Sequence, residues 1–306
     1  MPKYPIRVGF CAPSRAVIDI STPALAKLYF TDRGAQVVLH DTVFKNVKQF
    51  AGTEDERVQG LMSIACDPEI DLVLPIRGGY GLSRILDRID FGRIAERSPV
   101  FCGFSDFTAF TLAYLAKTGK VSYQGPNGSD FADELQFATE QSFYNALFKE
   151  EWVASFPCKE APDLNIQGTL WGGNLSMLVS LLGTPYFPDI EGGILFLEDC
   201  NDRAYRIDRN LMQLAMAGVL QKQQIILFGD FRDADPAHPR DNDFLFKDML
   251  GFLRGRVPNV PMLMGLPFGH SPVKITLPVG ANVHLKTEKG YVVMSTFEHP
   301  TLKPRF

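Results

Sequence analysis

The sequence predicts an α/β protein with two parts: an N-terminal domain built on a doubly wound, mostly parallel sheet, and a smaller, mixed α/β, β-rich C-terminal domain. In the first half, short apolar runs alternate with segments of helical periodicity, which is typical of a parallel sheet covered by helices. From Lys274 onward the pattern becomes hairpin-like. A chain of 306 residues is long enough for one large domain or two medium ones with cores of their own.

The N-terminal domain is expected to span residues 1–150. Thr22 and Pro23 mark the start of its first helix, and Thr53 is a candidate N-cap followed by acidic residues. Pro75 has to lie at the end of its strand because it cannot donate a ladder hydrogen bond. Strands are predicted at residues 6–12, 36–40, 71–76, 100–104 and 121–124, with further helices over residues 82–89 and after residue 105.

The C-terminal domain is expected to span residues 167–306, after a linker at residues 151–166 that contains Pro157 and Pro162 and shows no clear period. A glycine-containing loop is predicted to lead into an apolar helix within residues 168–183. Further strands are expected at residues 193–197, 224–228 and 261–266, helices at 206–220 and 243–254, and turns at 280–282 and 289–290.

Composition narrows the class of protein. The net charge of −4 and pI near 5.8, without a basic stripe, argue against a nucleic-acid partner. No apolar run of about 18 residues is present to span a membrane, and the N-terminus has no signal-peptide core, so no membrane association and a cytoplasmic location are expected. Five scattered cysteines without CxxC spacing fit reduced thiols. We therefore expect no metal and no cofactor.

Ser105 lies at a sharp corner between a predicted strand and a predicted helix. There its hydroxyl would be lifted clear of the sheet, and the N–H of Asp106 would lie at a helix N-terminus that can stabilise an oxyanion. The alternative is that Ser105 or Asp106 only caps the helix. A nucleophile also requires a base and an orienting acid.

Glu198 and His270 are the candidates for those two roles. Glu198 ends an apolar strand, and His270 follows a strand in a loop shaped by Pro267 and Gly269. Active sites of open α/β sheets gather at such strand ends. Glu198 also has a plainer interpretation, because a glutamate beside Asp199 is commonly a solvated or salt-bridged surface group.

The loop at residues 77–81 (RGGYG) follows a buried strand. Its glycines would let backbone N–H groups approach a ligand, so Gly78 or Gly79 could supply a second oxyanion donor. A phosphate-binding loop is the rival, but the lysine of GxxxxGK[ST] and the full GxGxxG spacing are missing. A tight turn without function also fits. Cys102 lies within a buried run and is expected to be inert.

Five segments in this order carry a family resemblance: residues 77–81 (RGGYG), 103–108 (GFSDFT), 169–175 (TLWGGNL), 197–199 (LED) with the downstream Arg206 and Arg209, and 265–270 (GLPFGH). Together they resemble the LD-carboxypeptidase family over nearly the whole chain. Two departures affect pocket polarity: Phe104 stands where the family often has histidine, and Asp202 ends a segment that in relatives tends to end in Asn-Glu.

The resemblance implies a serine peptidase with Ser105 as nucleophile, Glu198 as orienting acid and His270 as base, in a cleft between two domains. It also implies a homodimer, and a substrate whose L,D-peptide bond releases the terminal D-alanine of a murein tetrapeptide in peptidoglycan recycling. A free carboxylate has to be recognised by such an enzyme.

For that carboxylate we nominate Arg77 and Arg206, either of which could instead pair with a structural carboxylate. Trp171 and Asn174 are candidates for lining the cleft, although packing at a helix entry is an equal alternative for both.

Three rival functions remain open at this stage. A microcin-immunity-type peptidase of the same family would cleave aminoacyl-nucleotide amides. A non-enzymatic two-lobed binding protein would also have a cleft, but it would leave Ser105, Glu198 and His270 unexplained. A nucleotide-binding protein using Gly78 and Gly79 is the third.

Overall fold

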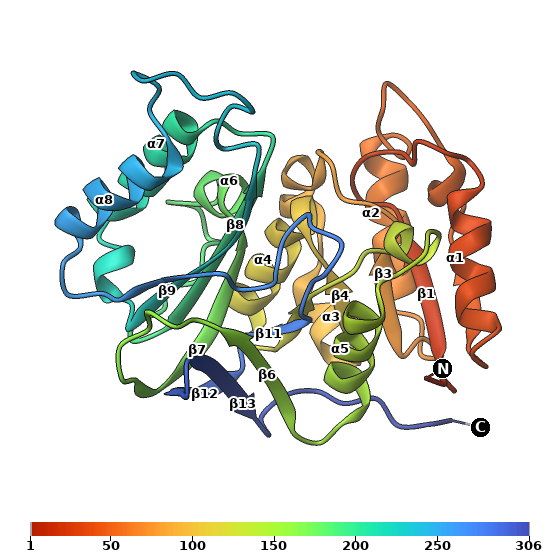
Figure 1. The fold of residues 1–306 in the computed structure, drawn as a ribbon. Helices are drawn as coiled ribbons and strands as arrows, with labels where there is room; N and C mark the ends of the chain where they lie inside the picture. The colour runs from red at the N-terminus through yellow and green to blue at the C-terminus, as the bar shows by residue number, and fades with distance from the viewer. Residues whose placement is uncertain (1, 306) are drawn as a thin grey trace.

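Two β-sheets, one in each lobe, organise the computed structural model, which describes residues 2–305 (Figure 1). Within these residues the N-terminal sheet has six strands in the order β11-β5-β4-β3-β1-β2. Five of them run parallel, and only β11 is antiparallel to its neighbour. The strands are β1 (Arg7–Cys11), β2 (Gln36–Leu39), β3 (Leu72–Pro75), β4 (Val100–Gly103), β5 (Ser122–Gln124) and β11 (Leu277–Val279).

Helices cover the N-terminal sheet, and local capping explains where several of them begin. Thr53 and Glu56 form a reciprocal capping box at the start of α2, as the predicted N-cap requires, and Asp90 caps α3. Tyr4, Phe30 and Phe143 form an aromatic cluster that joins α1 to α5. The helices are α1 (Thr22–Thr31), α2 (Glu54–Ala65), α3 (Phe91–Arg97), α4 (Thr108–Thr118) and α5 (Phe137–Phe148), with 3₁₀ turns at Asp41–Phe44, Leu82–Arg84, Leu86–Arg88, Ser105–Phe107 and Gly128–Phe131.

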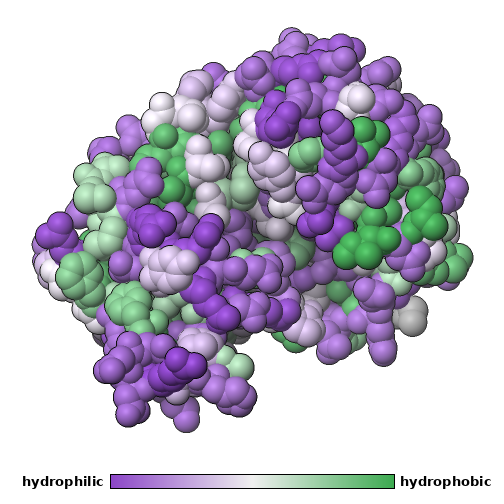
Figure 2. Space-filling model, turned by 90° about the horizontal axis from the view of Figure 1, so that it is seen from above, coloured by the Kyte–Doolittle hydropathy of each residue, from purple (hydrophilic) through white to green (hydrophobic). Residues whose placement is uncertain are grey.

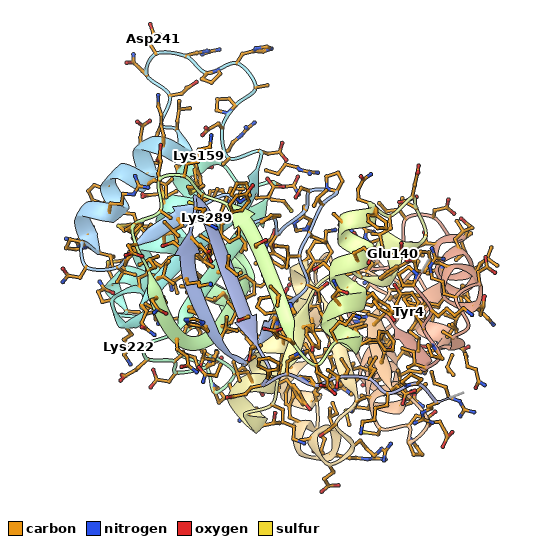
Figure 3. All side chains as sticks on the ribbon, turned by 60° about the horizontal axis from the view of Figure 1, so that its bottom comes forward. Tyr4, Glu140, Lys159, Lys222, Asp241 and Lys289 are labelled. Atoms are coloured by element: carbon orange, nitrogen blue, oxygen red, sulfur yellow. The ribbon has the colours of Figure 1, made fainter. Side chains whose placement is uncertain are left out.

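The C-terminal sheet is mixed, in agreement with the prediction. Among the described residues it has seven strands in the order β10-β9-β8-β7-β12-β13-β6. The first four are parallel, whereas β12, β13 and β6 are antiparallel and lie side by side (Figure 3). The strands are β6 (Trp152–Pro157), β7 (Asn165–Asn174), β8 (Ile194–Cys200), β9 (Ile225–Arg232), β10 (Met262–Met264), β12 (Asn282–Glu288) and β13 (Tyr291–Thr296); the helices are α6 (Leu175–Ser180), α7 (Ala204–Met216) and α8 (Phe246–Arg256), with a 3₁₀ turn at Leu220–Lys222.

Segments from the C-terminal half of the chain complete the N-terminal lobe. Strand β11 comes from the C-terminal half but pairs with β5 of the N-terminal sheet. The predicted linker at residues 151–166 is not structureless, because it contains β6, the edge strand of the C-terminal sheet. After β13 the chain returns to the first lobe, where Leu302 N donates to Leu147 O and Arg305 pairs with Asp71.

Three local predictions were wrong. Residues 82–89 form two 3₁₀ turns instead of one helix, and α3 and α5 were not predicted. The predicted loop from residue 168 is strand β7, in which Gly172 lies so close to β8 that a Cβ would meet Phe196 O at 1.9 Å. The turn at residues 280–282 joins the two sheets and does not close a hairpin.

Between residues 2 and 305 no helix has the length and apolar character needed to cross a membrane.

Candidate active site

Ser105 occupies the corner between β4 and α4, as predicted, in a left-handed conformation with φ 63°. The corner depends on Gly103, because a Cβ there would meet Pro75 Cγ at 2.6 Å and Phe107 Cδ1 at 2.7 Å. Asn127 Oδ1 accepts the N–H of Phe104 at 3.1 Å and supports the strand side of the corner. The serine is therefore held in a backbone conformation that L-residues disfavour.

Ser105, His270 and Glu198 lie in one chain of hydrogen bonds across the two lobes. His270 Nε2 is 3.3 Å from Ser105 Oγ, and His270 Nδ1 is 2.8 Å from Glu198 Oε2. Gly269 permits this approach, because its positive φ of 138° and missing side chain let the loop pack against Glu198 Cβ. The three residues singled out from the sequence thus meet in the arrangement of a nucleophile, a base and an orienting acid.

The carboxylate of Glu198 is fully buried and receives a second partner from Asn174. Asn174 Nδ2 donates to Glu198 Oε1 at 3.0 Å and to Asp199 Oδ1 at 3.2 Å. Asn174 is itself fixed, because its Oδ1 caps α6 at Met177 N and its N–H donates to Thr108 Oγ1. Asn174 therefore helps to orient the Glu198 carboxylate, and it also lines the cavity.

The surroundings of His270 favour its charged form. Burial by itself lowers the pKa of His270, but hydrogen bonds with Cys200 and Glu198 raise the pKa to about 10. The ring of Phe104 packs against the imidazole with centroids 4.9 Å apart. The site thus stabilises the imidazolium that forms when the serine loses its proton.

Gly78 lies directly beside the nucleophile. A Cβ on Gly78 would be 2.8 Å from Ser105 Cβ and 3.3 Å from Asp106 N, so the glycine loop and the helix start converge at Ser105. Gly78 thus lies beside both Ser105 and Asp106 N, two of the positions at which the sequence predicts an oxyanion hole.

A buried pair of side chains fixes the glycine loop. Arg57 is only 1% exposed and donates to Pro13 O at 2.6 Å and to Gly81 O at 2.8 Å. The Asp106 carboxylate accepts the N–H of Leu82 at 2.9 Å, and burial raises the pKa of this carboxyl.

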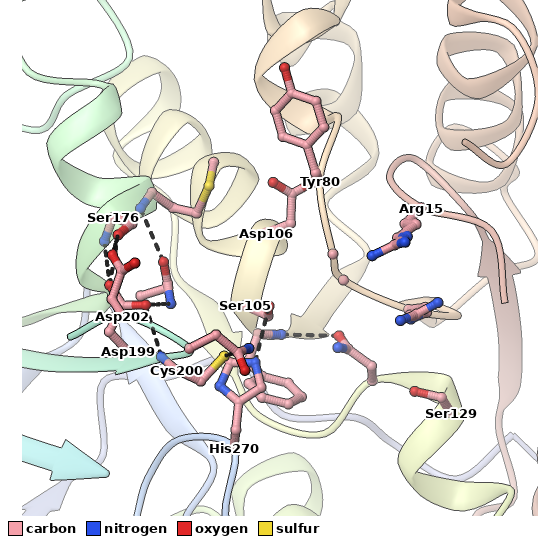
Figure 4. A pocket seen from close by; sticks show the side chains of 18 of the residues that line it. Arg15, Tyr80, Ser105, Asp106, Ser129, Ser176, Asp199, Cys200, Asp202 and His270 are labelled. Carbon is pink, nitrogen blue, oxygen red and sulfur yellow. Dashed lines mark hydrogen bonds between the residues drawn. The ribbon is translucent and has the colours of Figure 1, made fainter. Parts of the chain in front are cut away.

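A cavity of about 640 Å³ opens at these residues between the lobes, on a mostly hydrophilic face of the molecule (Figures 2 and 4). Arg77 and Arg206 both line it, as proposed from the sequence. Trp171 does not line this cavity, and the packing alternative applies to it. It is fully buried, donates to Gln223 Oε1 at 2.9 Å and borders a separate cavity of about 180 Å³, because β7 is a central strand that turns this side chain into the core.

Several lining residues were not found from the sequence. Arg15 follows β1, Cys200 ends β8 and Lys274 precedes β11. Nothing in their spacing connects them to Ser105. The other lining residues not predicted include Ser129, Asp130, Ser176, Met177 and Asn201.

Comparison with protein families gives two matches. The LD-carboxypeptidase N-terminal domain matches residues 8–125, and the LD-carboxypeptidase C-terminal domain matches residues 167–285. The first match includes Ser105, and the second includes Glu198 and His270.

Individual relatives agree over nearly the full length. A probable murein peptide carboxypeptidase of Bacillus subtilis is 34% identical over 97% of this chain and 94% of its own length. A putative carboxypeptidase of Streptomyces coelicolor is 35% identical over 86% of this chain and 82% of its own. The crystal structure of muramoyltetrapeptide carboxypeptidase from Oxalobacter formigenes has a TM-score of 0.89 and 37% identity, covering 96% of this chain and all of the other.

The microcin C7 self-immunity protein MccF shares the fold. Its structure in complex with glutamyl sulfamoyl guanosine has a TM-score of 0.81 at 21% identity, over 96% of this chain and 97% of the other.

Proposed function

We propose that this protein, which belongs to the LD-carboxypeptidase family, hydrolyses the L,D-peptide bond before the terminal D-alanine of murein tetrapeptides. Ser105 is the nucleophile in this proposal. The observation that carries the proposal is the hydrogen-bonded chain from Ser105 through His270 to Glu198. The names of the relatives from Bacillus subtilis and Oxalobacter formigenes support a murein peptide as substrate.

The mechanism follows from these contacts. With the Nδ1 proton donated to Glu198, His270 Nε2 accepts the Ser105 proton as Oγ attacks the carbonyl carbon. The oxyanion is held by the N–H groups of Asp106 and of Gly78 or Gly79, each of which contributes about 3 kcal/mol. His270 then gives the proton to the leaving amine, the D-amino acid departs, and water hydrolyses the acyl-enzyme by the reverse use of the same base.

The proposal includes a role in peptidoglycan recycling in the cytoplasm and a homodimeric state, both carried over from the family resemblance. Cell fractionation tests the location, and finding the protein outside the cytoplasm would contradict it. Light scattering of the purified protein tests the oligomeric state, and a monomer would contradict the homodimer.

The test is mass spectrometry of a defined muropeptide mixture before and after incubation with the protein. We expect loss of one D-alanine from tetrapeptides and no change in tripeptides, and Ser105→Ala should lower turnover by a factor of about 10⁴ or more while leaving the fold intact. An aminoacyl sulfamoyl nucleoside is added as a competing substrate. Preferential cleavage of that conjugate, or near-normal activity of Ser105→Ala, would overturn the proposal.

A further inference from the structure

Cationic side chains in the cavity lining differ in whether an acid neutralises them. Arg206 Nε lies 2.8 Å from Asp202 Oδ1, and Lys274 Nζ lies 2.5 Å from Asp130 Oδ1. Both of these cations therefore have a carboxylate partner within the protein.

Arg15 and Arg77 also line the cavity, but within residues 2–305 neither guanidinium forms an ion pair. Arg77 Nη1 donates to Ala16 O at 2.8 Å, which fixes the side chain without neutralising it. Burial and then the positive charge of Arg15 lower the pKa of Arg77, so the two like charges lie near each other. Two neighbouring guanidinium groups without an acid repel one another until an anion binds between them.

The position of this pair is linked to the oxyanion hole. Arg77 directly precedes Gly78, and Arg15 N donates to Gly78 O at 3.3 Å. The Arg15 side chain packs on the backbone of Gly79, where a Cβ would meet Arg15 Cβ at 2.6 Å. The loops that position the proposed oxyanion donors thus also position both guanidinium groups.

On the opposite side of the cavity the arginine, Arg206, already has an acid partner in Asp202. In Figure 4, Asp199, Asp202 and Ser176 lie on the wall formed by the C-terminal lobe, Arg15 and Ser129 lie on the wall formed by the N-terminal lobe, and Ser105 and His270 lie between them. Arg15 and Arg77 therefore offer a peptide bound across Ser105 two guanidinium groups on the N-terminal side of the site.

We propose that Arg15 and Arg77 together bind the terminal carboxylate of the peptide, so that the leaving D-amino acid lies against the N-terminal lobe and the acyl part extends towards the wall of Asp199 and Asp202. The inference rests on the proposed function and adds to it the orientation of the substrate. Paired guanidinium groups suit a carboxylate because their N–H donors match its two oxygens. Arg206, the other residue nominated from the sequence, is less suited to this role because its guanidinium already pairs with Asp202.

The experiment compares a tetrapeptide with the same peptide carrying a C-terminal carboxamide, using kcat/KM for release of the last residue. The wild-type enzyme should prefer the free acid by a factor of about 10 to 100, as expected for charge-assisted hydrogen bonds. Arg15→Gln and Arg77→Gln should each lower kcat/KM for the acid about tenfold or more, mainly through KM, and change the value for the amide by less than about threefold.

Arg206→Gln is the matched control, because it removes a cavity arginine that already has an acid partner. It should preserve the ratio of acid to amide, whatever its effect on the absolute rate. Arg77→Lys tests the planar fork and should restore only part of the preference for the acid.

The possible results distinguish a failure of the carboxylate subsite from a failure of the proposed peptidase function. If the wild type releases D-alanine from the acid but Arg15→Gln and Arg77→Gln keep the acid preference, the subsite is wrong and the proposed function stands. If Arg206→Gln alone abolishes the preference, the carboxylate lies on the other wall. If the wild type cleaves neither peptide, both proposals fall.

Discussion

The charge state of His270 decides how the site responds to pH. The base must be neutral to accept the serine proton, whereas its hydrogen bonds with Cys200 and Glu198 raise its pKa to about 10. We therefore expect kcat/KM to rise from about pH 6 to about pH 9, because the neutral fraction of His270 in the free enzyme increases over this range. The measurement is a pH profile of D-alanine release at low substrate concentration.

Cys200→Ala supplies the matched comparison for this profile. Removing the thiol takes away one contribution that raises the pKa of His270, so the rising limb should move to lower pH. A profile that is flat across this range, or a limb that stays in place in Cys200→Ala, would contradict the stated cause.

At the same residue scale, the sequence pointed to the residues of the triad but not to all of their partners. Ser105, Glu198 and His270 each end or follow a strand, and parallel strands bring such positions to one edge of a sheet. The pairing of Arg15 with Arg77 depends on how two loops pack on each other. No spacing within either loop encodes that contact, so only the structure reveals it.

At the scale of elements, the glycine loop at residues 78–81 is fitted to the start of α4. Gly78→Ala would place a methyl group 2.8 Å from Ser105 Cβ and 3.3 Å from Asp106 N. We expect kcat to fall by a factor of about 10² to 10³, as for loss of an oxyanion donor, with a small change in melting temperature. Steady-state kinetics and thermal unfolding check this prediction.

The control for Gly78→Ala is Gly119→Ala, at the C-terminal end of α4. Gly119 has a positive φ of 67°, unlike Gly78, and no heavy atom lies within 4 Å of a Cβ built there. Gly119→Ala should lower stability by about 1 kcal/mol through backbone strain and leave kcat unchanged. If both variants lose activity equally, the effect at Gly78 is not local to the nucleophile.

The strands β1 to β5 were predicted well because their apolar runs are continuous, whereas glycines concealed strand β7. The N-terminal strands lie within two residues of their predicted bounds. Strand β7 was read as a loop because Gly168, Gly172 and Gly173 resemble turn residues. In the structure the glycines are needed for close packing, with Gly172 against Phe196 O and Gly173 against Thr108. Strand β6 alternates buried and exposed residues, a period of two that two prolines obscured.

At the scale of the whole molecule, the lobes are joined by C-terminal segments that pack on the N-terminal lobe, in addition to the chain that links them. Because β11 pairs with β5 and the chain after β13 packs on the first lobe, a fragment of residues 1–150 lacks an edge strand and the tail contacts. We expect this fragment to be unstable or aggregated, since the exposed edge of β5 is left unpaired.

Circular dichroism and gel filtration of the fragment, beside the full chain, would test this. The full chain should unfold in one transition. A monomeric fragment with a cooperative transition of its own would show that the N-terminal lobe does not depend on β11.

The backbone of Ser105 has a last consequence. An L-residue held at φ 63° carries about 1 to 2 kcal/mol of conformational penalty, which a glycine at the same corner would not have. Folding stability and catalysis therefore make opposite demands at this position. The protein keeps the serine hydroxyl and tolerates a strained backbone there.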